Sequence, residues 1–101
     1  MACLDVYPMP GEGRDGYVVD VQADLLSHLV TRIVVPLLSE DTASKPISKL
    51  NPVFEILGVR YVMVTQAIAS ISGRELRRAV ASLTDHHDRI TRAHNILLLG
   101  F

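Results

Sequence analysis

The residues best suited to chemistry in this 101-residue sequence are three histidines near its end, His86, His87 and His94. On a helix the adjacent side chains of His86 and His87 diverge by about 100°, and His87 and His94 are separated by about 10 Å of rise. No carboxylate or cysteine completes a set at the spacing of metal ligands. We therefore predict partly exposed helix histidines, with neither a metal nor another cofactor.

A glycine pattern near the start of the sequence has the spacing of a dinucleotide-binding motif. Gly11, Gly13 and Gly16 read G-x-G-x-x-G. That motif works only when a helix follows, because the helix N-terminus faces the pyrophosphate. Residues 17–24 instead alternate between apolar and polar side chains in their second half, which indicates a strand. The glycines are therefore expected to form a hairpin connection and not a nucleotide site.

Candidate nucleophiles and anion-binding residues are few. Cys3 has no neighbouring base in the sequence and is expected to be a small core or interface residue. Ser27 lies beside His28, but adjacency in a turn does not produce the geometry of a catalytic triad. Three arginines could grip phosphate, although an ordinary solvated surface is the simpler interpretation: Arg74, Arg77 and Arg78. No set of residues requires an active site, so the sequence predicts a protein that is not an enzyme.

Length and composition place further bounds on the chain. Its 101 residues predict one domain, spanning 1–101. A hydrophobic content of 49% and a mean hydropathy of +0.27 are high for a small monomer, which favours an oligomer. The net charge of -1 argues against direct, non-specific binding to nucleic acid. A single cysteine, no export signal and no apolar run near the ~20 residues of a membrane span predict a cytoplasmic protein with no membrane partner.

Most of the chain reads as short strands. Runs rich in β-branched and aromatic residues, bounded by glycine and proline, predict strands at 3–7, 17–24, 31–37, 53–57, 59–65 and 68–71. Pro36 is expected at a strand end or a sheet edge, because proline cannot donate to a ladder. Residues 39–49 are expected to form a surface loop. Residues 72–81 are ambiguous, since Ser72 and Glu75 have capping-box spacing while Gly73 disfavours a helix.

The last nineteen residues predict the helix around which this sheet is organised. Thr84 is expected to cap it, with Asp85 and Asp88 in its first turn. One apolar face recurs at helical spacing and comprises Leu83, Ile90, Ala93 and Leu97. The pattern as a whole indicates a mainly β protein, an antiparallel sheet or small barrel that carries one helix on one side.

The final helical turn is apolar all round, which one sheet cannot cover. Successive apolar residues occupy 96–99, and Gly100 ends the helix before a terminal Phe101. Some of these side chains must therefore face another molecule or remain as an exposed apolar patch. We interpret this end of the chain as a binding device.

Several stretches taken together resemble a known family. They read VDVQAD at 19–24, LL at 25–26, RIVVPL at 32–37, NPV at 51–53, VMVT at 62–65 and IASI at 68–71, followed by Ile90, Ala93, Asn95, Gly100 and Phe101. This combination is similar to the CcdB toxins of bacterial type II toxin–antitoxin modules. The resemblance covers most of the chain and implies an SH3-like small barrel of antiparallel strands, of the CcdB/PemK type, with a C-terminal α-helix. It also implies a symmetric homodimer.

The resemblance further implies a non-enzymatic poison of DNA gyrase. Members of the family bind the gyrase A subunit and trap the enzyme on cleaved DNA. A labile CcdA-like antitoxin neutralises them, and the pair represses its own operon, so that operator DNA is bound only through the antitoxin complex. The gyrase-binding residues map onto Leu99, Gly100 and Phe101. Residues expected at the dimer interface or the antitoxin site are Cys3, Ala23, Leu25, Asn95, Ile96 and Leu98.

Two departures and two alternatives accompany this resemblance. The family's best-known members have tryptophan where this chain has Leu99, and phenylalanine where it has Cys3. Loss of a large aromatic anchor from an interface centre costs about 2 kcal/mol or more of binding free energy. One alternative is an endoribonuclease similar to MazF or Kid, for which Arg32 and Thr31 are the candidate catalytic pair. The other is a chromosomal homologue that keeps the dimer and antitoxin binding but has lost toxicity.

Overall fold

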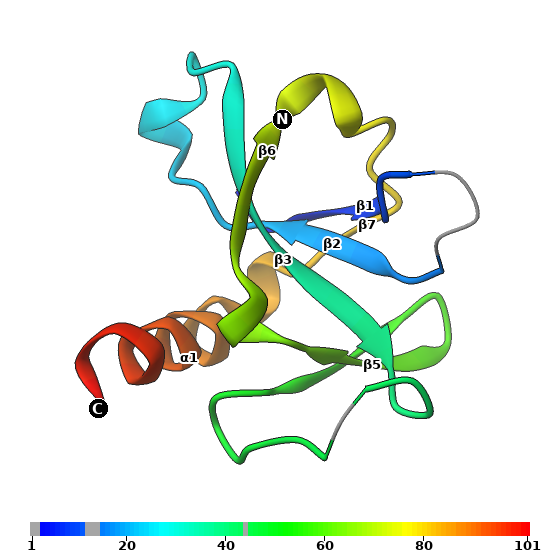
Figure 1. The fold of residues 1–101 in the computed structure, drawn as a ribbon, viewed down its shortest axis with the longest axis vertical. Coiled ribbons are helices and arrows are strands. Elements are labelled where there is room, and N and C mark those ends of the chain that lie inside the picture. The colour runs from blue at the N-terminus through cyan, green and yellow to red at the C-terminus, as the bar shows by residue number, and fades with distance from the viewer. Residues whose placement is uncertain (1–2, 12–14, 44) are drawn as a thin grey trace.

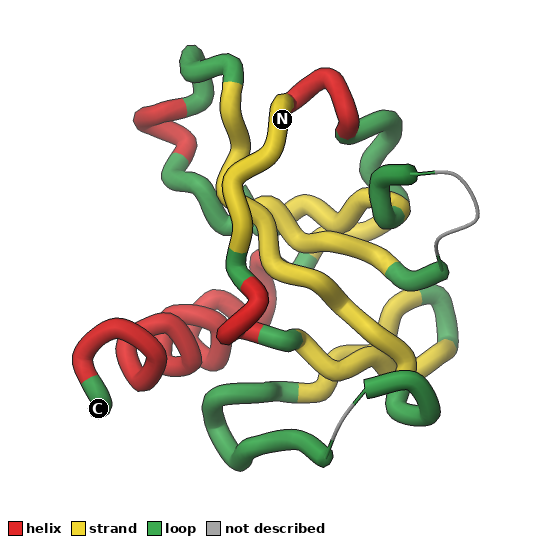
Figure 2. Tube along the Cα trace, viewed as in Figure 1, coloured by secondary structure: helices red, strands yellow, loops and turns green. Residues whose placement is uncertain are grey.

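The computed structural model describes residues 3–11, 15–43 and 45–101. The described residues form one antiparallel sheet that curls into a nearly closed barrel, with a single α-helix on one side (Figures 1 and 2). The strands are β1 (Asp5–Pro8), β2 (Tyr17–Asp20), β3 (Thr31–Ser39), β4 (Val53–Ile56), β5 (Val59–Met63), β6 (Ala69–Ser72) and β7 (Ala81–Ser82). The helix is α1 (His87–Leu99). The prediction of a mainly β barrel with a C-terminal helix is therefore confirmed.

Strand β3 joins the two halves of the sheet. The strand order is β4-β5-β3-β2-β1-β7, and β6 pairs with β3 as a branch from this path. One edge of β3 pairs with β2, while the other edge pairs with β6 over its first half and with β5 over its last residues. Two partners on one edge force the sheet to divide, and the two branches bend around the core.

The position of Pro36 is a correction. It lies in the middle of β3, opposite Val18 of β2, and not at a strand end or on a sheet edge. Its carbonyl accepts from the Val64 amide at 2.9 Å, so its backbone groups point toward the opening between β5 and β6. The β3–β6 register ends at Val34 and the β3–β5 register begins at Leu37. A proline fits at this gap because no ladder bond from its nitrogen is needed there.

The core lies between the barrel wall and α1. Its buried apolar residues come from five strands and from the helical segment, and they include Val6, Val19, Val35, Leu37, Phe54, Ile56, Met63, Leu83, Ile90 and Ala93. Arg89 adds a contact from the outside, with its guanidinium 4.6 Å from the centre of the Phe54 ring and its Nη2 donating to the Val53 carbonyl at 3.1 Å. Within the described residues, no helix combines the length and the apolar character that crossing a membrane requires.

The glycine-containing connection leads into a strand, as the sequence predicted. Met9 donates its amide to the Gly16 carbonyl at 3.1 Å, which closes the connection, and β2 follows at Tyr17. Gly16 has a φ of 99°, and a Cβ there would lie 2.8 Å from the Leu37 carbonyl oxygen. Glycine is thus required here for conformation and for space. Gly13 lies outside the described residues.

The start of the helix differs from the prediction. Residues Thr84–His86 form a short 3-10 turn, η4, and α1 begins only at His87 without a side-chain cap. Thr84 therefore does not cap the α-helix; its amide donates to Ser82 Oγ at 3.4 Å. Leu83 is buried just before the 3-10 turn, and Leu97 is only half-buried, so the helix's buried stripe is shorter than its sequence pattern.

The ambiguous segment at 72–81 is not an α-helix. Ser72 does cap, but only a 3-10 turn, η3 (Gly73–Glu75), by accepting from the Arg74 amide at 3.3 Å. The chain then extends, and the Val80 amide donates to the Val6 carbonyl at 2.8 Å next to β7. Hydrogen bonding to β1 gives the backbone groups of residues 80–82 partners that an isolated helical turn would lack. The predicted strand at 17–24 is likewise shorter in the structure: β2 ends at Asp20, and a 3-10 turn, η1, occupies Asp24–Leu26.

A buried ion pair connects β2 to β3. Arg32 donates from Nε to Asp20 Oδ2 at 2.8 Å, and its Nη2 lies 2.6 Å from the same oxygen. The two side chains are 2% and 0% exposed. This pair could not be predicted from the sequence, because twelve residues separate the partners and only the strand register brings them together.

Replacing Arg32 with methionine should strongly destabilise the fold, because the Asp20 carboxylate would remain buried without its cation. We expect the free energy of unfolding to fall by about 3–5 kcal/mol in urea titrations at fixed protein concentration. The matched control is Arg60→Met, which breaks the exposed Arg60–Glu40 pair at 3.1 Å. That change should cost about 0–1 kcal/mol. Equal losses in the two variants would contradict the role assigned to the buried pair.

Candidate functional site

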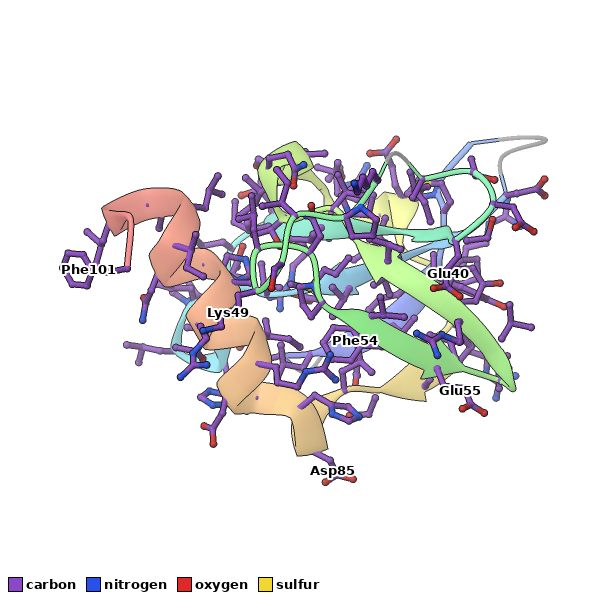
Figure 3. All side chains as sticks on the ribbon, turned by 90° about the horizontal axis from the view of Figure 1, so that it is seen from below. Glu40, Lys49, Phe54, Glu55, Asp85 and Phe101 are labelled. Carbon is purple, nitrogen blue, oxygen red and sulfur yellow. The ribbon has the colours of Figure 1, made fainter. Side chains whose placement is uncertain are left out.

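The end of helix α1 presents an exposed apolar tip, defined here as Leu98, Leu99, Gly100 and Phe101. The side chains of Leu98, Leu99 and Phe101 are 73%, 63% and 85% exposed. Figure 3 shows Phe101 at the free end of α1, with its ring directed away from the sheet. The apolar turn at 96–99 predicted exposed apolar side chains, and Leu98 and Leu99 are exposed. Three large apolar side chains at one projecting end form the kind of patch that marks an interaction site.

Gly100 sets the direction of this tip. It has a φ of 83°, in the left-handed region, and its amide donates to the Ile96 carbonyl at 3.0 Å. This conformation ends the helix and turns Phe101 out of it. A Cβ at Gly100 would meet nothing within 4 Å, so the backbone here is open to a partner that approaches closely.

A second exposed apolar surface lies on the connection between β2 and β3, which we call the 24–30 loop. Leu25 and Val30 are 86% and 83% exposed, and Leu26 and Leu29 are also exposed. The loop and the tip project from the same side of the molecule, at the left of Figure 1. Leu25 was predicted from the sequence to lie at the dimer interface or the antitoxin site, whereas Leu26, Leu29 and Val30 were not predicted there. The number of large apolar residues in this short connection was the signal that could have identified them from the sequence.

Polar residues at 20–24 hold this loop in place. Asp20 Oδ1 accepts from the Gln22 amide at 3.0 Å, and Gln22 Nε2 donates to the Leu26 carbonyl at 2.8 Å. Gln22 Oε1 in turn accepts from the Ile33 amide at 3.1 Å. The side chains of Asp20 and Gln22 are therefore buried and hydrogen-bonded inside the fold. These hydrogen bonds position the 24–30 loop, and the residues that form them are not themselves a site of chemistry.

The structure brings Cys3 to the side of α1. Cys3 and Asn95 line one open cavity of 290 Å³, together with Leu4, Val21, His87, Ile90, Thr91 and His94. The Cys3 amide donates to Asp24 Oδ1 at 2.7 Å, which ties the start of the chain to the 24–30 loop. Burial raises the pKa of the Cys3 thiol, and the carboxylates of Asp24 and Asp20 raise it further. A thiol with a raised pKa is a poor nucleophile at neutral pH.

The family model of the CcdB protein matches residues 4–100 of this chain. The chain belongs to the CcdB family. This membership agrees with the resemblance seen in the sequence and places the chain in the context of toxin–antitoxin systems.

Two solved structures share the fold of this CcdB family member. One is an endoribonuclease in complex with its cognate antitoxin from a mycobacterial species, with a TM-score of 0.80 and 13% identity over 97% of this chain and 94% of that chain. The other is the Mycobacterium tuberculosis toxin MazF-mt6, with a TM-score of 0.71 and 14% identity over 90% of this chain and 92% of that chain. At these identities the similarity concerns the fold alone.

The remaining tip and interface candidates lie near one another on α1. Ile96 and His94 are half-buried, whereas Asn95 is exposed. Ala23 is exposed at the start of the 24–30 loop. The structure thus places the sequence-predicted residues on two surfaces, the end of α1 and the 24–30 loop. Cys3 lines a cavity with α1 and donates its amide to Asp24 of the loop.

The three histidines of this CcdB family member make separate contacts. The His86 ring lies 5.1 Å from the Phe54 ring, His87 Nδ1 lies 3.7 Å from Asp88 Oδ1, and His94 Nδ1 lies 2.8 Å from the Ile90 carbonyl oxygen. In the ranges 3–11, 15–43 and 45–101, no three histidine, cysteine, aspartate or glutamate residues are grouped as metal ligands. His87 and His94 thus contact neighbours on α1, whereas His86 precedes the helix and contacts Phe54 of β4.

Arg32 and Thr31 do not form the pair that an endoribonuclease interpretation needs. Thr31 is exposed, whereas the Arg32 side chain is buried and engaged by Asp20. Side chains of adjacent strand residues point to opposite faces, so the two cannot act on one bound substrate. The candidate catalytic pair of Arg32 and Thr31 is therefore not formed in the structure.

The raised pKa of Cys3 predicts slow alkylation. At pH 7 to 8, iodoacetamide should modify Cys3 in the folded protein at least about tenfold more slowly than in the urea-unfolded chain, because less thiolate is present and access is restricted. The rate should increase as pH rises. Mass spectrometry after timed quenching measures both rates, and equal rates in the two states would contradict the environment described for Cys3.

Proposed function

We propose that this CcdB family member is the toxin of a type II toxin–antitoxin system. It acts without catalysis, by binding the A subunit of DNA gyrase and trapping the complex of gyrase with cleaved DNA. The observation that carries the proposal is the exposed apolar tip at the end of α1, in particular Leu99 and Phe101 around Gly100. A cytoplasmic site of action follows from this target.

The energetics of the tip support binding to a protein. Fully burying a leucine or phenylalanine side chain stabilises a complex by about 1.5–3 kcal/mol. Leu99 and Phe101 are largely exposed in the described structure, so most of that free energy is available to a partner. Gly100 carries no side chain between them, which allows a partner's surface to approach the backbone.

The same proposal includes an antitoxin and a regulatory role. A CcdA-like antitoxin neutralises the toxin, and the two together repress their own operon. One fold relative was solved in complex with its cognate antitoxin, which supports a partner of this kind. The net charge of -1 favours an arrangement in which the antitoxin, and not this chain, contacts operator DNA.

An endoribonuclease is the second candidate, and the fold likeness favours it. The two structural relatives are an endoribonuclease and a MazF toxin. Against this candidate, Arg32 is buried in an ion pair with Asp20 and its neighbour Thr31 faces the other way. We therefore place the endoribonuclease second.

We also propose that the protein is a homodimer. Leu98 is 73% exposed, Ile96 is half-buried, and both lie on the last turns of α1. Contact between two such surfaces around a two-fold axis would bury each patch against its copy. The two tips would then be presented together, which suits a target that is itself two-fold symmetric.

The dimer predicts a mass of two chains in sedimentation equilibrium at micromolar concentration. Leu98→Asp should raise the dimer dissociation constant by about tenfold or more, because it places a charge in an apolar interface. Leu57→Asp is the control, since Leu57 is similarly exposed on the turn between β4 and β5. A monomer mass for the unmodified protein, or equal effects of the two substitutions, would contradict the proposal.

Removing the tip should separate gyrase poisoning from folding. Deleting Leu99, Gly100 and Phe101 leaves the buried helix residues Ile90 and Ala93 in place, so thermal unfolding should change little. DNA cleavage by gyrase in the presence of the protein should be lost. Conversely, Leu99→Trp should strengthen cleavage by about tenfold, because an aromatic anchor is restored.

Gly100 offers a matched pair of variants for the same assay. Asparagine tolerates the left-handed conformation that Gly100 adopts, whereas arginine adds a long charged side chain at the point of contact. Gly100→Asn should retain more activity than Gly100→Arg, with similar thermal unfolding for both. Full cleavage activity in the variant lacking Leu99–Phe101 would remove the gyrase proposal.

A further inference from the structure

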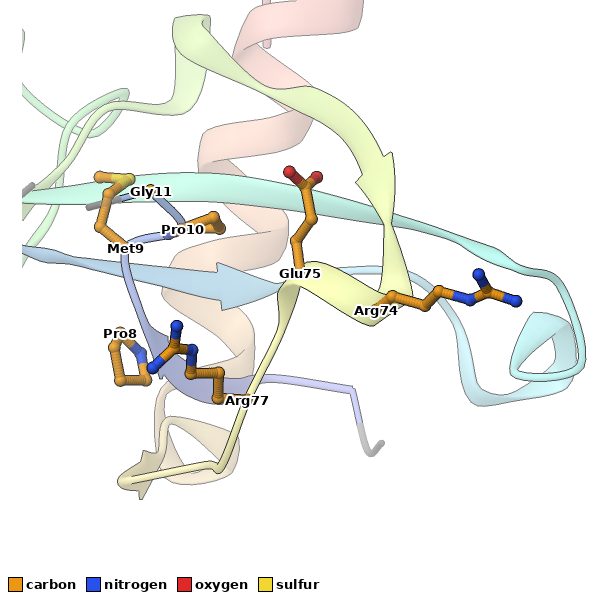
Figure 4. A pocket seen from close by; sticks show the side chains of 7 residues that line it. All are labelled: Pro8, Met9, Pro10, Gly11, Arg74, Glu75 and Arg77. Carbon is orange, nitrogen blue, oxygen red and sulfur yellow. The ribbon is translucent and has the colours of Figure 1, made fainter.

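A cavity between the start of the chain and helix α1 has no role in the function proposed above. It has a volume of 290 Å³, and we call it the Cys3 cavity. Cys3, Leu4 and Val21 line it from the first part of the chain, and its other lining residues belong to α1. Figure 4 shows a separate cavity of 670 Å³, between residues 8–11 and 74–77, which has no lining residue in common with it.

One face of α1 forms a side of the Cys3 cavity. Its lining residues recur at spacings of three and four, which places them on the same side of the helix: His87, Ile90, Thr91, His94 and Asn95. Ile90 is buried, whereas His87, Thr91 and Asn95 are exposed. The helix thus contributes an apolar base and a polar rim.

The first part of the chain contributes further apolar lining. Leu4 is buried, and Val21 and Cys3 are half-buried. Because burial raises the pKa of the Cys3 thiol, this group is neutral at pH 7 and behaves as a small, polarisable apolar side chain. Sites for small molecules typically combine apolar lining with a few polar groups. The Cys3 cavity has this composition.

The size and the lining of the cavity favour a flat ring. An apolar cavity of about 150 Å³ already accepts benzene, so 290 Å³ has room for one ring or for two fused rings. Sulfur makes favourable contacts with aromatic rings, and the imidazole rings of His87 and His94 offer flat surfaces for stacking. These contacts favour an aromatic ligand over an aliphatic one of equal size.

A metal ion does not suit the cavity, although a cysteine and two histidines line it. In the part of the chain that the structure describes, no three histidine, cysteine, aspartate or glutamate residues are grouped as metal ligands. His94 Nδ1 already lies 2.8 Å from the Ile90 carbonyl oxygen. The lining therefore favours an organic ligand.

We propose that the Cys3 cavity binds a small, neutral, planar aromatic molecule of one or two rings with one hydrogen-bonding group, the class of phenols and indoles. The ring packs against Leu4, Val21 and Ile90. The hydrogen-bonding group bonds the Thr91 hydroxyl or the Asn95 amide at the rim. This site is additional to the proposed toxin function and does not depend on it.

Isothermal titration calorimetry with the full chain tests the ligand class. The probes are indole, phenol and cyclohexanol, which has the hydroxyl of phenol without the aromatic ring. We expect indole to bind with a Kd of about 1 mM or tighter, and phenol to bind about fivefold more tightly than cyclohexanol. Equal affinity for phenol and cyclohexanol would overturn the proposal, as would no binding of any probe.

A tripeptide with tryptophan between two glycines separates a free ligand from the side chain of a partner protein. It carries the ring of indole on a flexible backbone, and ordering that backbone costs conformational entropy on binding. We therefore expect the tripeptide to bind more weakly than indole. Tighter binding of the tripeptide would overturn the assignment of a free small molecule.

Two matched pairs of variants test the location of the site. Cys3→Phe adds a ring beside the cavity and should weaken indole binding by about tenfold, whereas Cys3→Ser keeps the size of the side chain and should change it by less than about twofold. Thr91→Trp and Arg92→Trp both change exposed residues of α1, but only Thr91 lines the cavity. Thr91→Trp should weaken indole binding more strongly. Thermal unfolding checks that each variant is folded, and equal affinities within both pairs would overturn the location.

Alkylation of Cys3 gives an independent measure of occupancy. At an indole concentration ten times its Kd, iodoacetamide should modify Cys3 about tenfold more slowly than in the free protein, because the occupied cavity shields the thiol. An unchanged rate would contradict binding beside Cys3. The variant lacking Leu99–Phe101 keeps every residue of the cavity and should bind indole normally, so the gyrase assay and the indole assay can fail separately.

Discussion

The buried ion pair between Asp20 and Arg32 is the interaction on which the arrangement of this fold depends. It joins β2 to β3, and β3 is the strand that β2, β5 and β6 all pair with. Charges removed from water are stable only when their partners are fixed, so the pair favours one register between the two strands. The other carboxylate oxygen of Asp20 holds Gln22, which in turn bonds Leu26 and Ile33. The exposed 24–30 loop is thus supported from the interior.

The end of α1 lies outside the packed core of the barrel. Ile90 and Ala93 anchor the helix in the core, while Leu98, Leu99 and Phe101 contribute nothing to that core. The residues that anchor the helix and the residues exposed at its end are therefore different, so the proposed binding surface is separate from the core.

Local sequence patterns predicted the parts of the structure that depend on local periodicity, namely most of the strands and the exposed end of the helix. β-branched runs marked most of the strands, and the apolar turn at 96–99 marked the exposed tip. The errors came from long-range constraints. Pro36 sits inside β3 because two other strands leave a gap beside it, and Thr84 fails as a helix cap because a 3-10 turn precedes α1. The Asp20–Arg32 pair depends on the register between β2 and β3, so it was not visible in the sequence.

The central claim is that this protein acts by binding gyrase and not by cutting RNA. Purified protein incubated with gyrase and supercoiled DNA, and in parallel with RNA alone, tests it most directly. The account predicts linear DNA that accumulates with protein concentration and only when gyrase is present, together with intact RNA. Cleaved RNA without any gyrase-dependent linear DNA would contradict it.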